Sequence, residues 1–284
     1  MSTEVVITGT GVPHLAPGRA GPGVLVRHGE TALQFDAGRA TALRLCEAGT
    51  QPQALSALFI THHHSDHLTG LVDVIFARWL QTHDRHTPLP IVAPSGPATR
   101  FLERMLDPWQ DDIDVRIEHA GHPHRPDPVV TAFEASAGPV EVWRQGDVRV
   151  LACTVHHEPV VPAVAYRVET PDGAVVISGD TIACEEVQKL AQGADVLVHE
   201  AFRRALIAPA IERMPHLATI AAYHADTAEI GPLATKAGVR TLVLTHLIPA
   251  PTNEKQKQGF ADDVRAGGYD GELIVADDLT LVRF

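Results

Sequence analysis

Four histidines and one aspartate lie between residues 62 and 67, in the motif His62-x-His64-x-Asp66-His67. The motif follows the apolar run 58–60, which predicts the end of a buried strand, and the apolar segment after residue 70 predicts a helix. Neutral imidazole and carboxylate groups are ligands that suit zinc and similar divalent ions. The run is neither terminal nor uniform, as an affinity tag would be. It therefore predicts a metal site at the edge of a sheet.

Three further expected strands end in the same way, with a side chain that can bind a metal. The strands expected over 148–152, 174–178 and 240–245 run into His157, Asp180 and His246, respectively. One polar residue at a strand end is usually a satisfied buried histidine or a turn aspartate. Four such ends beside β-branched runs favour one shared metal centre instead. His156 precedes His157, and because successive strand residues point to opposite faces, the two cannot serve equally.

Several short motifs resemble the metallo-β-lactamase-fold hydrolases, in the ribonuclease Z and arylsulfatase-like (phosphodiesterase) branch. Besides the histidine motif they are Gly9-Thr10-Gly11-x-Pro13, Asp36-x-Gly38 and the segment that starts at His157-Glu158-Pro159. The resemblance extends from residue 9 to about residue 249. It implies an α/β fold, the four-layer αβ/βα sandwich, in which two mixed β-sheets lie face to face with helices outside and metals at one edge.

The resemblance also implies a two-metal centre in which Asp180 bridges the ions. The ligands of one ion would be His62, His64 and His157, and those of the other would be Asp66, His67 and His246. Two Zn²⁺ ions are expected, with Mn²⁺ or Fe²⁺ as alternatives. A hydroxide shared by ions about 3.5–4 Å apart is a nucleophile at neutral pH. The resemblance favours His157 over His156 as the ligand, and His63 is expected to face away.

Three residues are expected to act in catalysis: Asp66, His224 and Glu200. His224 stands where ribonuclease Z-like enzymes carry a histidine that contacts the scissile phosphate and can protonate the leaving group. Glu200, in Val-His-Glu-Ala, matches the glutamate of that family that orients this histidine. After His224 the chain has Ala225 and Asp226, where small hydroxyl residues are common in the family.

The composition fits a globular protein with a full core, since 45% of the 284 residues are hydrophobic. No window approaches the roughly 18 apolar residues of a membrane span, and the first residues do not form a signal peptide. Three cysteines lie far apart and imply neither a disulfide framework nor a thiolate zinc site. We therefore expect a cytoplasmic protein without a membrane partner. The net charge of −12 argues against broad nucleic-acid binding, which relies on a basic surface.

A single domain is expected over 1–284, with the segment 83–139 as an insertion or a lid over the site. Within this segment 107–114 and 120–128 are expected to be loops. Its three histidines, His119, His122 and His124, are expected to lie on a solvated rim rather than in a second metal site. The stretch 202–217 is irregular, with a helix expected near 209–214. Near the end of the chain, 274–276 and 279–282 predict a closing hairpin.

These observations predict a binuclear zinc-dependent hydrolase of small esters, with phosphodiesters and aryl sulfates ahead of lactones and β-lactams. Ribonuclease Z enzymes that process tRNA usually carry a long gripping arm near the strand that leads to Asp180, where this chain has only the turn 171–173. The short turn and the acidic charge place tRNA 3′-end processing second. A non-catalytic metal-binding protein and a flavodiiron-type redox protein are further alternatives. The expected partner is a small-molecule ester, and the oligomeric state, a homodimer included, stays open.

Overall fold

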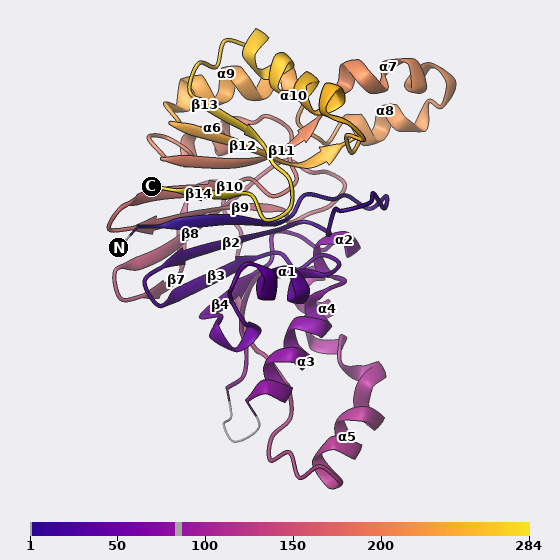
Figure 1. Cartoon of the computed structure of the whole chain (residues 1–284), viewed down its shortest axis with the longest axis vertical. Coiled ribbons are helices and arrows are strands. Elements are labelled where there is room, and N and C mark those ends of the chain that lie inside the picture. Colours follow the sequence, from indigo (N-terminus) through magenta and orange to yellow (C-terminus); the bar gives the residue numbers. More distant parts are fainter. Residues whose placement is uncertain (1, 83–86) are drawn as a thin grey trace.

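Two β-sheets pack face to face and form the two inner layers of the protein (Figure 1). The structure is a computed structural model that describes residues 2–82 and 87–284. Within these residues each sheet has seven strands, and each mixes parallel and antiparallel pairs. Helices cover the outer face of each sheet. The four-layer αβ/βα sandwich predicted from the sequence is confirmed.

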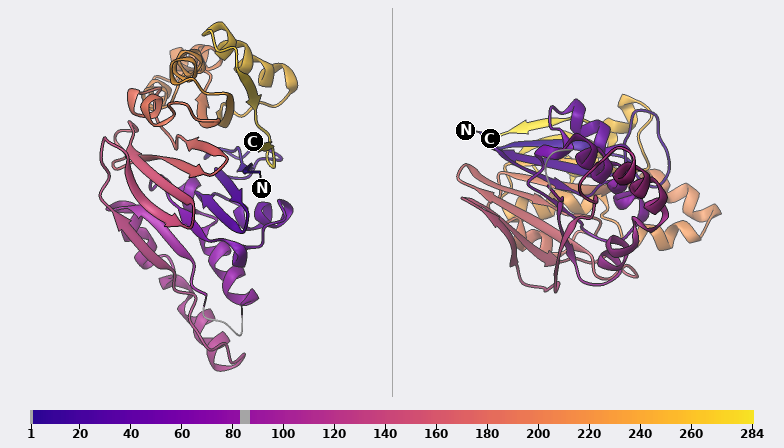
Figure 2. Two further views of the ribbon diagram at one scale, coloured as in Figure 1. Left: turned by 90° about the vertical axis from the view of Figure 1, so that its left-hand side faces the viewer. Right: turned by 90° about the horizontal axis from the view of Figure 1, so that it is seen from below.

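The first sheet contains strands from the first half of the chain together with the last strand. Its order is β14 (Leu281–Arg283), β1 (Glu4–Gly9), β2 (Gly23–His28), β3 (Thr31–Phe35), β4 (Ala57–Phe59), β5 (Pro90–Pro94) and β6 (Val129–Phe133). The order of the second sheet is β13 (Glu272–Val275), β12 (Thr241–Ile248), β11 (Val196–Phe202), β10 (Gly173–Ile177), β9 (Val164–Thr170), β8 (Val148–Thr154) and β7 (Val140–Gln145). Because β1 pairs with β14, the two chain ends lie close together (Figures 1 and 2).

The helices divide between the two outer layers and two projecting segments. Helices over the first sheet are α1 (Thr41–Glu47), α3 (Leu71–Gln81) and α4 (Pro97–Arg104), and those over the second are α6 (Glu185–Leu190), α9 (Thr227–Ala237) and α10 (Glu254–Ala266). The remaining helices are α2 (Ser65–Leu68), α5 (Gln110–Glu118), α7 (Arg204–Arg213) and α8 (His216–Ala221), with 3₁₀ turns at Pro52–Ala54 and Asp107–Trp109. None of the helices in the described part of the chain is long and apolar enough to cross a membrane.

Aromatic rings join the two sheets directly beneath the histidine motif. The rings of Phe35 and Phe59 from the first sheet stack at 4.7 Å, and each lies 5.4 Å from the ring of Tyr166 on β9. The Tyr166 hydroxyl donates a 2.6 Å hydrogen bond to the carbonyl oxygen of Ile60, two residues before His62. Burial of such rings is among the largest apolar contributions to a core. The packing between the sheets therefore fixes the end of β4, where the motif begins.

The predicted closing hairpin at 274–276 and 279–282 is wrong. β13 pairs in parallel with β12 of the second sheet, whereas β14 pairs antiparallel with β1 of the first. The turn between them crosses from one sheet to the other. In this turn, the Asp278 side chain accepts hydrogen bonds from the backbone N–H groups of Thr10 and Ala20 at 2.9 and 2.6 Å. Long-range contacts of this kind leave no local signal in the sequence.

The predicted loop at 107–114 is also wrong, because this stretch forms a 3₁₀ turn and most of α5. Asp111 and Asp112 lie in the first turn of α5, where negative charge favours a helix N-terminus. Ile113 is fully buried. The expected helix near 209–214 is longer and earlier than predicted, since α7 spans Arg204–Arg213 and tolerates Pro209 inside it.

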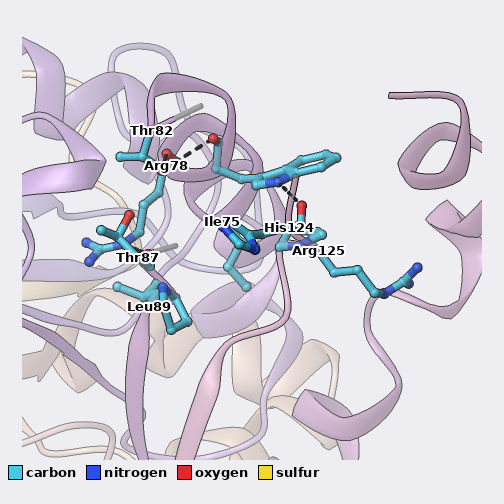
Figure 3. A pocket seen from close by; sticks show the side chains of 10 residues that line it. Ile75, Arg78, Thr82, Thr87, Leu89, His124 and Arg125 are labelled. Carbon is cyan, nitrogen blue, oxygen red and sulfur yellow. Dashed lines mark hydrogen bonds between the residues drawn. The ribbon is translucent and has the colours of Figure 1, made fainter. Parts of the chain in front are cut away.

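The solvated rim expected for the histidines of the 119–124 segment fits the exposed His119 but is wrong for His122. His124 lines a packing site against α3, shown in Figure 3. His122 is buried, and its two ring nitrogens lie 3.0 and 3.1 Å from the carbonyl oxygens of Trp79 and His124. The Trp79 indole N–H donates to His124, and Arg78 donates to four backbone carbonyls nearby. The cavity between these groups is only 10 Å³. The insertion or lid at 83–139 stays a prediction, and residues 83–86 of it lie outside the described residues.

Candidate metal centre

The sheet topology brings the predicted site residues to one edge of the sandwich. β10, β11 and β12 are parallel neighbours, and β8 runs in the same direction because both β8 and β10 are antiparallel to β9. Their carboxyl ends therefore meet at one edge, as do those of β3, β4 and β5 in the first sheet. In open α/β sheets, ligands bind at this kind of edge.

Two groups of side chains converge there. The ligand atoms of His62, His64, His157 and Asp180 lie within 4.8 Å of one another, and so do those of Asp66, His67 and His246. These are the seven residues that the sequence predicts as metal ligands. His64 is the residue before α2, and Asp66 and His67 lie in that short helix. His63 does not join either group.

The structure separates His156 from His157. The His157 side chain is buried, and its Nε2 lies 3.2 Å from His64 Nδ1. His156 is exposed and points toward Glu186, with 3.3 Å between its Nε2 and a carboxylate oxygen. Only His157 therefore reaches the cluster.

Backbone irregularities aim two of the clustered side chains. Asp180 follows Gly179, which has a φ of +60°, and a Cβ atom there would lie 2.9 Å from the Val164 carbonyl oxygen. His246 has a φ of +45° and is the extra residue of a bulge, since Thr245 pairs with Glu200 and Leu247 with Ala201. Bulges often occur where a strand must redirect a side chain toward a site.

One carboxylate oxygen, Asp180 Oδ2, lies at the centre of the cluster. Its distances to the Nε2 atoms of His62, His67, His157 and His246 are 3.8, 3.3, 3.9 and 3.4 Å. The Nε2 atoms of His62 and His67 are nevertheless buried without a hydrogen bond, since proximity alone does not give hydrogen-bond geometry. Bonds of about 2.0–2.1 Å to a four-coordinate ion separate its ligand atoms by about 3.3 Å. The spacing and the unsatisfied nitrogens therefore fit divalent ions among these side chains.

The opposite ring nitrogens of three clustered histidines are held by the protein. His62 Nδ1 lies 3.0 Å from Thr61 Oγ1, His157 Nδ1 donates to the Tyr223 carbonyl at 2.9 Å, and His67 Nδ1 donates to Asp36 Oδ2 at 2.7 Å. Such bonds fix the tautomer that leaves Nε2 free for a metal, and they orient the ring.

Asp36 is a further residue of the site. It belongs to the Asp36-x-Gly38 motif, but the sequence alone predicts no role for it in the metal centre. It is buried with a φ of +54°, and it accepts hydrogen bonds from Thr61 N, Thr61 Oγ1 and His67 Nδ1 at 2.7–2.8 Å. It thereby links the residue before His62 to His67. The signal that could have found it is an aspartate at the end of β3, the strand next to β4.

Burial and charge act in opposite directions on the clustered groups. Burial lowers the pKa of His62 well below its usual range, which keeps this imidazole neutral as a ligand must be. Burial alone would raise the pKa of Asp180, but His246 and His67 hold it well below its usual range. Burial would also lower the pKa of His67, but the Asp180 and Asp36 carboxylates raise it. The negative charge of these carboxylates thus favours a positive charge nearby, which a divalent ion supplies.

A second buried pair, Glu200 and His224, lies beside the cluster. His224 Nδ1 donates a 2.7 Å hydrogen bond to Glu200 Oε1, and both side chains are buried. The same Glu200 oxygen accepts a 2.9 Å hydrogen bond from Thr181 N, next to Asp180. A ring nitrogen of His224 lies within 4.8 Å of ligand atoms of Asp180 and His246. The pair predicted from the sequence is therefore assembled at the cluster.

The chain is similar to known proteins of one family. Residues 31–247 match the family model for the beta-lactamase superfamily domain. Over 281 residues the chain is 37% identical to Ribonuclease Z of Mycolicibacterium paratuberculosis, which covers 99% of this chain and 98% of that protein. The chain belongs to the ribonuclease Z branch of the metallo-β-lactamase superfamily. It is therefore a metal-dependent hydrolase, and its fold together with the clustered histidines and aspartates indicates a divalent metal centre.

Two solved structures show the same fold over the whole chain. The metallo-beta-lactamase fold protein YhfI from Bacillus subtilis superposes with a TM-score of 0.74 at 19% identity, covering 100% of both chains. The short form of human tRNase Z superposes with a TM-score of 0.69 at 21% identity, covering 98% of both. At these identities the likeness concerns the fold alone.

This member of the ribonuclease Z branch has an open pocket beside its metal centre. The pocket has a volume of 570 Å³ and includes His64, Asp66, Asp180, His224 and His246. The other walls come from the loop after β1, from the α7–α8 segment and from the chain after β12. In Figure 1, α7 and α8 project beyond the strands on the side where that loop and α2 also lie.

Proposed function

We propose that this hydrolase cleaves phosphodiester bonds and that His224 donates a proton to the leaving oxygen. The observation that carries the proposal is the 2.7 Å hydrogen bond between His224 and Glu200, in a buried pair beside the metal centre. A histidine held by a carboxylate can act as a general acid. Such a donor helps most when the leaving oxygen is a poor leaving group, as the alkoxide of a phosphodiester is.

The seven clustered side chains are the proposed ligands of two ions. One ion would be held by His62, His64 and His157, and the other by Asp66, His67 and His246. Asp180 would bridge them, since its Oδ2 lies within 3.3–3.9 Å of four histidine nitrogens. Zn²⁺ suits this donor set, with Mn²⁺ or Fe²⁺ as alternatives. Bound ions of this kind supply an activated water and compensate the charge of the phosphate.

Glu200 keeps the proton donor charged. Burial lowers the pKa of His224, but the neighbouring Glu200 carboxylate more than offsets this and raises that pKa to about 9. Since Nδ1 is engaged by Glu200, Nε2 carries the proton that the leaving oxygen receives. Among the described residues, Asp66 and Asp180 are the two carboxylates that line the pocket. Asp66 would be a ligand of the second ion and would hold it next to the substrate.

A substrate panel tests the proposal. Metal-loaded protein is assayed with bis-p-nitrophenyl phosphate, p-nitrophenyl sulfate, a homoserine lactone and a cephalosporin. We expect hydrolysis of the phosphodiester and its loss on chelation. Turnover confined to the sulfate, the lactone or the cephalosporin would contradict a phosphodiesterase.

Precursor tRNA is a second candidate substrate, and the names of the relatives favour it. The relative that is 37% identical over nearly its full length is a Ribonuclease Z. This finding supports tRNA 3′-end processing more directly than it supports a small-ester substrate. Incubation of the metal-loaded protein with a precursor tRNA that carries a 3′ trailer tests it, with release of the intact trailer as the expected product.

A further inference from the structure

We propose that the pocket beside the metal centre binds the apolar leaving group of a small phosphodiester, such as a substituted phenol. The inference rests on the proposed phosphodiesterase function and adds the class of substrate. In the reaction, water forms the new bond to phosphorus and the P–O bond to the aryl oxygen breaks. That oxygen takes the proton of His224, and the proton released by the attacking water restores it.

In the described part of the chain, the pocket walls outside the metal centre are mostly apolar and contain no lysine or arginine. Their large apolar side chains are Leu15, Phe202, Ile207, Leu217, Ile220 and Ile248. A volume of 570 Å³ lies in the range of about 300–1,000 Å³ typical of small-molecule sites. Such sites combine an apolar lining with a few polar groups, which here include the metal-centre residues.

The apolar wall adjoins the proposed proton donor. The His224 ring lies 5.7 Å from the ring of His246 in the metal centre, and 6.3 and 5.0 Å from the rings of Phe202 and Tyr223 in the wall. The leaving oxygen must be within hydrogen-bonding distance of His224 to receive its proton. The group attached to that oxygen therefore extends toward Phe202, Tyr223 and the α7–α8 segment.

Another part of the wall, the loop between Thr10 and Ala20, is anchored to the body of the protein. Asp278 accepts hydrogen bonds from Thr10 N, Ala20 N and Arg44 Nε at 2.6–3.0 Å, so both ends of the loop between Thr10 and Ala20 are held. Within that loop, Leu15 is 79% exposed at the pocket. The exposed Leu15 side chain therefore offers an apolar surface on an anchored loop, and a hydrophobic substituent of the substrate can pack against it.

The same features disfavour a polyanion in this pocket. Nucleic-acid grooves neutralise phosphates with lysine and arginine, and affinity falls when such contacts are few. Among the residues that the structure describes, the lining has neither, and the chain carries a net charge of −12. A small diester carries a single negative charge, which the metal centre can neutralise.

Two diesters that differ in the size of the apolar group test the inference. Methyl phenyl phosphate and methyl 4-tert-butylphenyl phosphate release phenols of similar acidity, so chemistry alone gives similar rates. With the metal-loaded protein we expect kcat/KM to be at least tenfold higher for the tert-butyl compound, because one methylene in an apolar pocket already changes kcat/KM by about tenfold or more.

Two leucines of the α7–α8 segment provide the matched variants. Leu217 lines the pocket, whereas Leu206 is 38% exposed and does not. Leu217→Ser should lower the ratio of the two kcat/KM values at least threefold, and Leu206→Ser should leave it unchanged. Binding of 4-tert-butylphenol, measured by calorimetry, should weaken in the first variant only.

Each outcome bears on the inference separately from the proposed function. If the phenol binds as expected but neither diester is hydrolysed, the pocket assignment stands and the phosphodiesterase fails. If the diesters are hydrolysed with a ratio near one, or with the same ratio in Leu217→Ser as in the parent, the pocket assignment fails. Cleavage of precursor tRNA with an aryl ratio near one would likewise overturn it in favour of an RNA substrate.

Discussion

Replacing Glu200 by glutamine isolates the charge that keeps His224 protonated. In the parent protein a single oxygen of Glu200 accepts hydrogen bonds from both His224 Nδ1 and Thr181 N, at 2.7 and 2.9 Å. The amide oxygen of glutamine can accept both bonds, so Glu200→Gln preserves the geometry. What it removes is the negative charge beside the imidazole.

The magnitude follows from the pKa of His224. The carboxylate raises this pKa from an ordinary 6.5 to about 9, which corresponds to about 3 kcal/mol. Without the charge, the pKa of His224 falls, because the Glu200 carboxylate no longer offsets burial. A return to the ordinary value of 6.5 would lower the protonated fraction about thirtyfold at pH 8 and less than about twofold at pH 6. The variant should therefore lose activity at pH 8 and regain most of it at pH 6.

The assay compares two diesters that place different demands on a proton donor. Methyl phenyl phosphate has a poor leaving group, and methyl p-nitrophenyl phosphate has one that is stable as an anion. We expect the ratio of parent to variant rates to rise from pH 6 to pH 8 with the phenyl compound and to change little with the p-nitrophenyl compound. Bound metal ions would lower the pKa of His224 in both proteins, because a nearby positive charge disfavours the imidazolium form. The transition would then move to lower pH in the same direction.

A second histidine–carboxylate pair supplies the control. Glu186 lies 3.3 Å from His156 Nε2, outside the metal centre. Glu186→Gln should leave both pH profiles unchanged. A Glu200→Gln variant whose loss is the same at pH 6 and pH 8, or the same for both substrates, would refute the proton-donor role of His224 and leave Glu200 with a structural one.

Three further predictions concern the metal centre. Asp180→Ala should lower the occupancy of both ions together, measured by elemental analysis of the purified protein, and intact loading would remove the bridging role. His157→Ala should reduce the metal content far more than His156→Ala, and the opposite order would reverse the ligand assignment. Asp36→Ala should weaken metal affinity about 10–100-fold in a competition titration with a chelator, because His67 loses the carboxylate that orients it; unchanged affinity would count against that role.

The identities of the clustered residues could be predicted because their signal is local. A run of apolar residues marks each strand, and the polar residue after it is visible in the sequence, as at Asp180 after β10. Parallel strands then place such ends at one edge without further information. The choice of His157 over His156 required the resemblance, and the structure supports it by burying only the first.

Features that depend on distant contacts could not be predicted. The last two strands have the composition of a hairpin, but their partners β12 and β1 lie in different sheets. The role of Asp36 depends on β3 lying beside β4 and on the short helix that carries His67. The pocket wall from α7 and α8 comes from a stretch with weak periodicity. Its apolar residues meet only because the segment folds over the metal centre.

Glu200 connects the proposed proton donor to the proposed bridging ligand. Its Oε1 binds His224 Nδ1 and Thr181 N, and its own backbone N–H donates to Ser178 Oγ, so it touches the chain on both sides of Asp180. The imidazole and the proposed bridging carboxylate therefore share one point of attachment. Cleavage of a phosphodiester would require a fixed separation between the His224 imidazole and the Asp180 carboxylate. The attacked phosphorus would lie beside the ions, and the departing oxygen would lie beside the proton donor. One buried carboxylate can thus set the distance on which the proposed reaction depends.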